Sequence, residues 1–288
     1  MRTTLGIELG INCAIKLSAN NRYQQGSLLN QNEPEVRAYI SGESISQTSI
    51  DKLNTFVLSI KEGFGITTLS EAFDCMYWFR GETATITLKN LVKNAHHATA
   101  LNSPIFAPFE GYTGVVANKA NIRTNYNPAT DAIALQPLNA AFGAYFTSER
   151  TVSYSKIFGI EHDDDVDLND MYITPYGSRT RVFSSYHLSL SVANSLGFRA
   201  GMRNNDSQQI GVINKTITTG IRAITSIPSK RFRFLAVASN DDGGAFDVNY
   251  PDDIQIAFGF LGRSMSQSEI NVLVDAIETY IATEDVFF

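Results

Sequence analysis

The feature that most constrains the fold is a long series of short segments rich in Phe, Tyr, Val, Ile and Thr, which extends from about residue 75 to residue 262. Several of these segments alternate along the chain, as residues 153–158 do, and clusters of Gly, Asn and Asp separate them at intervals of roughly eight to fifteen residues. Alternation places successive side chains on opposite faces of a strand. The pattern therefore predicts a β-sandwich or jelly roll, because a parallel α/β fold would need helices between the strands.

One amphipathic helix is expected before this series, at residues 46–62. Apolar side chains recur there at the spacing of one helix face, at Ile50, Leu53, Val57 and Ile60. Ser49 is the expected N-cap, because a serine hydroxyl accepts a hydrogen bond from a free amide of the first turn. Gly63 is the expected terminating residue, because glycine readily adopts the left-handed conformation that ends many helices.

A second helix is expected near the C-terminal end of the chain. Ser266 and Glu269 have the spacing of a capping box, in which each side chain binds the backbone amide of the other residue. One apolar face then follows, formed by Ile270, Leu273, Val274, Ile277 and Ile281. Such a face needs a partner surface, so we expect this helix to cover the preceding sheet edge or the helix at residues 46–62.

The first 45 residues lack the periodicity of the rest of the chain. They are rich in Asn and Gln, and Gly26, Pro34 and Gly42 mark turns within them. We interpret residues 1–45 as an extended N-terminal attachment arm. Residues 46–288 are then expected to form one jelly-roll domain with its flanking helices.

The charge pattern argues against two classes of partner. Charged residues make up 18% of the chain, its net charge is −6, and no stretch concentrates Lys and Arg, so nucleic acid is not an expected partner. No run of about 20 apolar residues occurs, so membrane insertion is not expected either. A surface so poor in charge suits contacts with other proteins in an assembly.

Three segments are informative when taken together. They read ISQTSIDKLNTFVLSIKEGFGITTLSEAFDCMYWF, LKNLVKNAHHATALNSPIFAPFEGYTG and FGFLGRSMSQSEINVLVDAIETYI. In this order they resemble bacteriophage virion proteins that contain a concanavalin A-like, or laminin G-like, jelly roll. In that family a short helix leads into an apolar strand, a Lys- and Asn-rich stretch crosses the molecule, and a strand, a glycine and a capped helix end the chain. The resemblance covers residues 46–288 and implies a mainly β, concanavalin A-like jelly-roll sandwich with one amphipathic helix before it and one C-terminal helix.

The acidic segment at residues 160–170 admits three interpretations. Glu161, Asp163 and Asp165 are candidate Ca²⁺ ligands, because calcium prefers carboxylate oxygens. The same residues are spaced like the Glu-x-Asp-x-Glu of laminarinase-like glycoside hydrolases, which place two carboxylates on one strand face. Here the last position is Asp, whose shorter side chain would not reach the glycosidic oxygen in the same way. An exposed acidic turn is the third interpretation.

A second loop rich in Asp and Asn lies at residues 239–253, between two strand signals. Carboxylates and an amide can bind sugar hydroxyls while an aromatic ring stacks on the sugar. The candidate glycan ligands are therefore Asp241, Asp242, Asp247, Asn249 and Tyr250. Gly243 and Gly244 suit a long hairpin loop equally well, with no ligand involved.

Other residues that commonly carry function are interpreted as structural. Trp78 is flanked by apolar residues, which predicts burial in the core rather than a platform for sugars. His96 and His97 are adjacent, so on an extended chain they face opposite ways, and no zinc site is expected there. Apart from the candidate Ca²⁺ ligands, no motif calls for a cofactor.

The resemblance implies a non-enzymatic structural component of a tailed-bacteriophage virion, such as a capsid accessory or fibre protein, made in the host cytoplasm. Its expected partners are other virion proteins and further copies of itself. A lectin-like protein that binds host surface glycan is the first alternative. Glycoside hydrolysis by Glu161 and Asp165 is the second.

Overall fold

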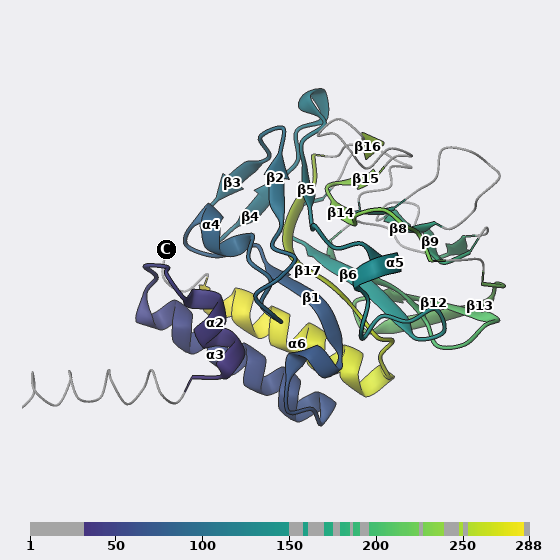
Figure 1. Cartoon of the computed structure of the whole chain (residues 1–288), viewed down its shortest axis with the longest axis horizontal. Helices are drawn as coiled ribbons and strands as arrows, with labels where there is room; N and C mark the ends of the chain where they lie inside the picture. Colours follow the sequence, from purple (N-terminus) through teal and green to yellow (C-terminus); the bar gives the residue numbers. More distant parts are fainter. Residues whose placement is uncertain are drawn as a thin grey trace, which may run out of the picture.

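The computed structural model describes residues 32–149, 158–160, 170–174, 179–184, 187–190, 196–224, 227–238, 248–249 and 253–284. Two β-sheets pack face to face, and helices cover the outer face of one of them (Figure 1). The chain is therefore a mainly β jelly-roll sandwich with an amphipathic helix before it and another at its C-terminal end. This confirms the fold expected from the sequence.

The first sheet, called sheet A here, has β17 (Gln255–Gly262) at its centre. β6 (Ala140–Phe146) pairs with one side of β17, and β1 (Phe73–Trp78) and β4 (Gly111–Thr113) share the other side. The sheet is completed by β11 (Gly197–Arg203), β12 (Gln208–Ile213), β13 (Thr216–Ile221) and β3 (Ile105–Ala107). The strands β13 and β3 lie at its two ends.

The second sheet, sheet B, faces sheet A. In order it contains β10 (Leu188–Ser189), β9 (Arg179–Val182), β8 (Met171–Thr174), β7 (Phe158–Ile160), β14 (Arg233–Phe234), β5 (Asn121–Arg123) and β2 (Thr99–Leu101). β15 (Ala236–Ala238) runs parallel to β7 and pairs antiparallel with β16 (Val248–Asn249). The other strand pairs of the described residues are antiparallel. Short strands joined by turns favour this arrangement.

Two long helices lie side by side on the outer face of sheet A, α3 (Gln47–Phe64) and α6 (Gln267–Glu284) (Figure 1). α2 (Pro34–Ile40) precedes α3 and packs against it. The short helical segments are α4 (Ala84–Thr87), α5 (Pro128–Asp131), η1 (Leu69–Glu71) and η2 (Val116–Asn118). None of the helices in the described residues has the length and apolarity needed to cross a lipid bilayer.

The caps of α3 differ from those expected. Ser46, rather than Ser49, is the N-cap, and its hydroxyl accepts a hydrogen bond from the Ser49 amide. Gly65, rather than Gly63, ends the helix in the left-handed conformation, with φ 64°. Gly63 lies inside the helix, where a β-carbon would stand 2.4 Å from Cγ1 of Val272 in α6. Glycine is required at position 63 because the two helices pack closely there, and not because the helix ends there.

The capping box of α6 is confirmed. The Ser266 amide donates to Oε2 of Glu269 at 2.7 Å, and the Glu269 amide donates to Oγ of Ser266 at 3.3 Å. Arg263 donates to the other carboxylate oxygen at 2.6 Å. Burial acts to raise the pKa of the Glu269 carboxyl, but the hydrogen bonds from Arg263 and Ser266 outweigh it and lower the pKa below its ordinary value. The apolar face expected for this helix packs into the core above sheet A.

The expectation of an extended arm over residues 1–45 is wrong for residues 34–40. These residues form α2, and Pro34 lies in its first turn, where the missing amide hydrogen and fixed φ of proline suit a helix start. Two apolar side chains of α2 enter the core with those of α3, namely Val36 and Tyr39. Residues 1–31 lie outside the described residues.

A buried ionic cluster fastens α2 to α3. Nζ of Lys61 donates to Glu33 at 2.5 Å and to Glu35 at 2.7 Å, and the other carboxylate oxygen of Glu35 accepts a hydrogen bond from the Leu69 amide at 3.0 Å. Burial acts to lower the pKa of Lys61, and the two carboxylates outweigh it and raise the pKa. The ammonium therefore stays charged, and removing one partner would leave the opposite charge buried and unpaired.

Two apolar cores hold the layers together. Trp78 of β1 is 1% exposed and lies between sheet A and the helices, with its ring centroid 4.0 Å from that of Tyr280 and 5.3 Å from that of Phe56. This confirms the expected burial of the single tryptophan. A second cluster fills the space between the two sheets, and its centre is formed by Phe142, Phe158, Phe232 and Phe234.

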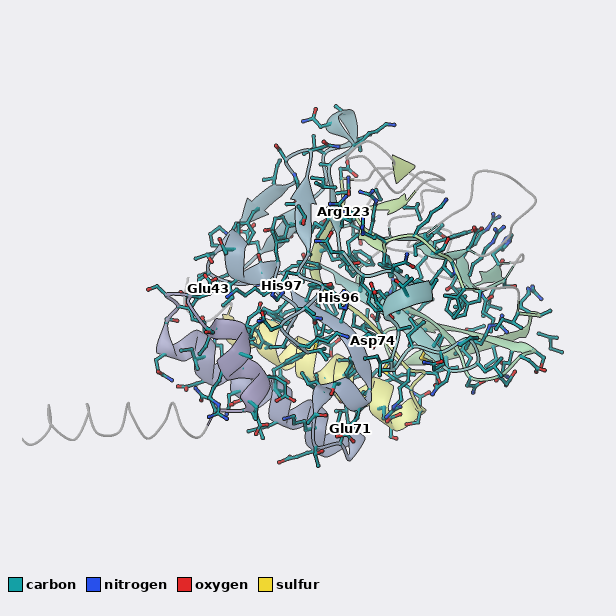
Figure 2. All side chains as sticks on the ribbon, viewed as in Figure 1. Glu43, Glu71, Asp74, His96, His97 and Arg123 are labelled. Carbon is teal, nitrogen blue, oxygen red and sulfur yellow. The ribbon has the colours of Figure 1, made fainter. Side chains whose placement is uncertain are left out.

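A buried carboxylate on β1 holds the segment that leads into β6. Asp74 is 1% exposed (labelled in Figure 2). One of its oxygens accepts hydrogen bonds from the amides of Ile133 and Ala134 at 3.0 and 3.1 Å. The other accepts from the Leu135 amide and the Tyr126 hydroxyl, both at 2.9 Å. The carboxylate thus supplies the acceptors that this stretch of backbone cannot find in a sheet.

Candidate functional site

A pocket of about 700 Å³ opens where the edges of the two sheets meet, between β2 of sheet B and β3 of sheet A. Only residues 102–104 connect these two strands, so the chain passes from one sheet to the other along the pocket wall. α4 and the segment after it also contribute lining residues. The lining consists of Ala84, Thr85, Leu88, Lys89, His97, Ala98, Ala100, Asn102, Ser103, Pro104, Phe106 and Tyr112.

The connection between β2 and β3 has an unusual backbone. Asn102 and Ser103 both adopt left-handed conformations, with φ of 59° and 58°. For residues with a side chain this conformation costs about 1 kcal/mol each, so two in succession require support from the surroundings. Nδ2 of Asn102 donates to the carbonyl of Lys119 at 3.3 Å. The tight reversal places both side chains in the pocket lining.

Two aromatic rings contribute an apolar surface to the pocket. Phe106 and Tyr112 are register partners on β3 and β4, and their ring centroids are 5.0 Å apart. Tyr112 is buried, and its hydroxyl donates to the carbonyl of Ala84 at 3.1 Å. Burial raises the pKa of this phenol, so it stays neutral. Phe106 is only half-buried, which leaves part of its ring available to a ligand.

The imidazole of His97 is held as one neutral tautomer. Its Nδ1 accepts a hydrogen bond from the Asn90 amide at 3.1 Å, so Nε2 carries the proton and donates to Oδ1 of Asn94 at 3.0 Å. Burial lowers the pKa of His97, and electrostatic repulsion, first from Lys89 and then from His96, adds to this effect. At neutral pH this ring therefore contributes no charge to the pocket.

The positive charge of Lys89, at the rim of the pocket, is balanced by Glu43. Nζ of Lys89 lies 2.9 Å from a carboxylate oxygen of Glu43, and it also donates to the carbonyl of Ser41 at 2.9 Å. No Asp or Glu lines the pocket within the described residues. The exposed hydroxyls of Thr85 and Ser103 are not engaged by any other group of the described chain, so they can bind a ligand.

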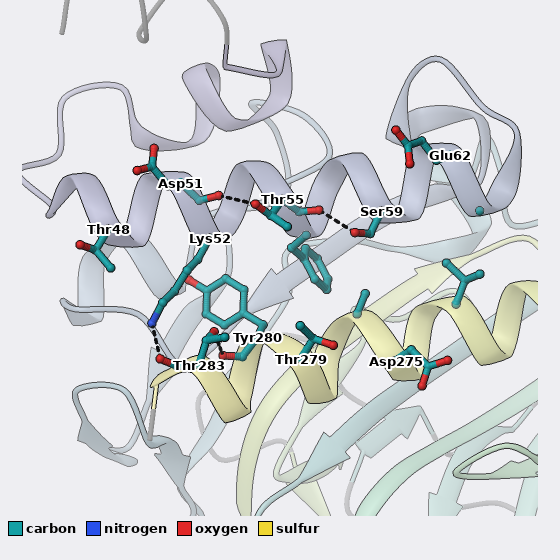
Figure 3. Close-up of a pocket in the computed structure, with 14 residues that line it drawn as sticks. Thr48, Asp51, Lys52, Thr55, Ser59, Glu62, Asp275, Thr279, Tyr280 and Thr283 are labelled. Atoms are coloured by element: carbon teal, nitrogen blue, oxygen red, sulfur yellow. Dashed lines mark hydrogen bonds between the residues drawn. The ribbon is translucent and has the colours of Figure 1, made fainter. Parts of the chain in front are cut away.

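A second hollow of about 780 Å³ runs along the outside of the molecule between α3 and α6 (Figure 3). Its hydroxyls bind the backbone of their own helices: Thr55 donates to the carbonyl of Asp51 and Ser59 to that of Thr55, both at 2.9 Å. Lys52 of α3 donates across it to the carbonyl of Thr283 at 2.8 Å. This hollow is the seam between two packed helices, and its polar groups are largely used, so it offers less to a ligand than the pocket at the sheet edges.

The two acidic loops predicted to bind ligands fall mostly outside the described residues. Glu161, Asp163, Asp165, Asp241, Asp242, Asp247 and Tyr250 are not among the described residues. Asn249 belongs to β16, where its backbone pairs with Val237. The parallel register sets Ile160 beside Ala238, so both acidic segments leave sheet B from the ends of neighbouring strands. Their roles in binding calcium, glycan or substrate stay predictions.

The extended chain assumed for the adjacent histidines is not found, because His96 has a left-handed backbone with φ of 57°. The two imidazoles still contact different segments, since His97 binds Asn90 and Asn94. Nδ1 of His96 is 3.1 Å from the carbonyl of Asn125 and 3.6 Å from a carboxylate oxygen of Asp131. Across the part of the chain that the structure describes, no three His, Cys, Asp or Glu side chains are grouped as metal ligands would be.

Sequence reasoning missed the pocket. It considered His97 only as a metal ligand and assigned no role to Thr85, Asn102, Ser103 or Phe106. The available signal is the Asn-Ser-Pro run at residues 102–104, whose composition is typical of a turn. That run does not reveal that the turn joins the edges of two different sheets.

Comparison with known proteins identifies the fold and no family. No protein-family model matches this chain, and no curated protein matches it in sequence. A sialidase of Trypanosoma rangeli, solved in complex with 2-keto-3-deoxy-D-glycero-D-galacto-2,3-difluoro-nononic acid, aligns with a TM-score of 0.50 and 12% identity. The alignment covers 82% of this chain but 40% of the sialidase chain, so this chain spans less than half of that protein.

Two further solved structures align less well. Domain 4 of AbnA, a GH43 extracellular arabinanase from Geobacillus stearothermophilus in complex with arabinotriose, has a TM-score of 0.44 and 11% identity, over 70% of this chain and 98% of that domain. The binding domain of botulinum neurotoxin DC in complex with SialylT has a TM-score of 0.44 and 14% identity, over 73% of this chain and 52% of the other. At such identities a likeness concerns the fold alone.

Proposed function

We propose that this chain is a non-catalytic carbohydrate-binding module, and that the sugar enters the pocket between β2 and β3. The observation that carries this proposal is the half-buried ring of Phe106 next to the ligand-accessible hydroxyls of Thr85 and Ser103 in one pocket. A sugar presents an apolar face of C–H groups and a rim of hydroxyls, so a single ligand matches both kinds of surface.

The charge state of the pocket favours a neutral sugar residue. The imidazole of His97 is neutral, and the ammonium of Lys89 is paired with Glu43. An anionic sugar would compete with Glu43 for Lys89, the one lysine among the described residues that line the pocket. A neutral hexose or pentose, in contrast, needs hydroxyl partners, which Thr85 and Ser103 supply.

The Trypanosoma rangeli sialidase, which has a similar fold, was solved with a nononic acid derivative. That ligand is a sugar acid, so it is a reason to test glycans as a class and not an argument for a neutral sugar. A phage receptor-binding protein would use such a module to hold glycan on the host surface. Membership of a virion, with virion proteins as partners and synthesis in the host cytoplasm, stays a prediction from the sequence resemblance.

The experiment is a glycan array with the purified full chain displayed at high valency, followed by calorimetry on any glycan that binds. Phe106→Ala removes the exposed ring and is expected to weaken binding at least tenfold. Thr85→Val keeps the shape of the side chain but removes its hydroxyl, and it is expected to weaken binding several-fold. Ile105→Ala is the matched control, because Ile105 is the neighbouring residue on β3, is 60% exposed and lies outside the pocket lining.

The result that contradicts the proposal is equally specific. A glycan that binds Phe106→Ala as tightly as the unmodified chain does not occupy this pocket. An array without any binder, from protein whose unfolding transition shows that it is folded, rejects the module altogether. If Ile105→Ala weakens binding as much as Phe106→Ala does, the glycan binds the exposed surface of β3 and not the pocket.

A further inference from the structure

The strand β13 forms an open edge of sheet A, at the far right of Figure 1. It pairs with β12 on one side, and no strand of the described residues pairs with its other side. Its side chains are largely exposed, and Ile221 reaches 83%. An edge of this length presents a row of backbone donors and acceptors that another strand can use.

The hydrogen bonding of β13 to β12 shows which groups face outward. The Arg222 amide donates to the Ser207 carbonyl at 2.7 Å, and these residues are directly opposite, because Gln208 pairs with Ile221. In an antiparallel pair the residues alternate between those that bond to the neighbour and those that point away from it. The backbone groups that point to the open side are therefore those of Ile217, Thr219 and Ile221. The Ile221 carbonyl accepts from the exposed guanidinium of Arg222 at 2.6 Å, and it retains a second lone pair.

Within the described residues, the strand itself lacks the sequence features that usually prevent strand pairing. Natural edge strands carry lysine, proline or a bulge that discourages a second strand. Residues 216–221 read TITTGI, without charge or proline, and their register with β12 is continuous. Lys215, just before the strand, is already paired with Asp275 of α6 at 2.5 Å.

We propose that β13 pairs antiparallel with β13 of a second copy of this chain, about a two-fold axis that passes beside Thr219. In this register Ile217 faces Ile221 of the second copy, and Thr219 faces its own counterpart. Each outward amide on one strand then meets an outward carbonyl on the other. A shift by two residues would leave one outward residue of each strand without a partner and would separate the isoleucines.

The side chains on the helix-covered face support this register. Ile217 packs at the margin of the core between sheet A and the helices, whereas Ile221 is exposed to solvent. Pairing places Ile221 of each copy against Ile217 of the other, so apolar surface at the edge of each core is buried between the two copies. Two copies would share one continuous sheet, and the pockets beside β3 would lie at its opposite ends, because β13 and β3 are the two ends of sheet A.

The first test is the mass of the full chain in solution by light scattering over a range of concentrations, with 31.7 kDa per copy. We expect a dimer that dissociates on dilution. Ile221→Lys and Thr219→Pro are each expected to yield monomers whose melting temperature equals that of the unmodified chain diluted to the monomer, because both alter only the outer side of the strand. Ile133→Lys is the matched control, because Ile133 is also highly exposed but lies far from β13 in sequence.

The second test fixes the register. Thr219→Cys, made in a Cys13→Ser background, is expected to form a disulfide-linked dimer under mild oxidation, because residues that face each other in a strand pair have Cα atoms about 5 Å apart. Thr216→Cys is the control, since the same register separates it from its counterpart by about 20 Å. The remaining cysteine, Cys75, is buried.

Three outcomes overturn the inference. A chain that stays monomeric at every concentration lacks the proposed pairing. A dimer that Ile221→Lys and Thr219→Pro both leave intact uses another surface. Equal cross-linking of Thr216→Cys and Thr219→Cys excludes the two-fold register. None of these outcomes depends on glycan binding, so the proposed dimer and the proposed sugar pocket are tested independently.

Discussion

Replacing Asp74 tests whether one buried carboxylate organises the segment before β6. The carboxylate accepts four hydrogen bonds, from the amides of Ile133, Ala134 and Leu135 and from the hydroxyl of Tyr126. Burial raises the pKa of Tyr126, so the phenol is a donor at neutral pH. Asp74→Ala removes both carboxylate oxygens, and with them all four hydrogen bonds, without altering the backbone of β1.

The expected loss follows from which donors can reach water. Leu135 and Tyr126 are fully buried, and each would be left without a partner at a cost of about 2 kcal/mol. Ile133 is 70% exposed and Ala134 is half-buried, so their amides can bind water at little cost. The free energy of unfolding should therefore fall by about 4 kcal/mol. Asp74→Asn keeps one acceptor and should lose about 2 kcal/mol.

The assay is equilibrium unfolding in urea, followed by the fluorescence of Trp78, which is the only tryptophan and is 1% exposed in the folded chain. The control is Asp131→Ala, because Asp131 is partly exposed and accepts the Asn127 amide at 2.9 Å, so about 1 kcal/mol should be lost. If Asp74→Ala is destabilised no more than this control, the carboxylate does not organise the segment and the reasoning is refuted.

Three further predictions concern the helical layer. Lys61→Met leaves Glu35 charged and buried, so the free energy of unfolding should fall by about 3 kcal/mol. Amide hydrogen exchange should become faster first in α2, and unchanged exchange there would contradict this prediction. Gly63→Ala places a β-carbon against Val272 and should lower the melting temperature. Adding Val272→Ala should restore much of the loss. A Gly63→Ala variant with an unchanged melting temperature would count against close packing at this position. The pKa of Glu269 is lowered by its hydrogen bonds, so its stabilisation is complete above pH 4.5 and lost as pH falls through the lowered value. Glu269→Gln should reduce the difference in stability between pH 7 and pH 3, and an identical pH profile would show that the capping carboxylate is not involved.

The helix ends show where local sequence stops being informative. Ser46 and Ser49 are both suitable N-caps, and Gly63 and Gly65 are both suitable C-terminal glycines. The carboxylate of Glu82, distant in sequence, binds the Ser46 amide at 2.9 Å and favours the earlier cap. A contact between helices accounts for glycine at position 63. Both choices depend on groups that a local pattern cannot include.

The sequence by itself determined the properties that repeat over a few residues. Alternation and turn composition determined a mainly β sandwich, and helical spacing with a capping box determined the two long helices and their buried faces. These patterns are reliable because each element must bury one face whatever its neighbours are.

Only the tertiary structure decided how separate elements meet. In the folded chain Lys61 pairs with Glu33 and Glu35. These contacts hold residues 34–40 as a packed helix, where the sequence had predicted an extended arm. The tertiary structure also set the edge of β2 beside that of β3 to form a pocket, and it placed β13 at an edge of sheet A, with no second partner strand among the described residues. Strand order and side-chain contacts between distant residues depend on the whole chain packing at once, so no short window of sequence contains them.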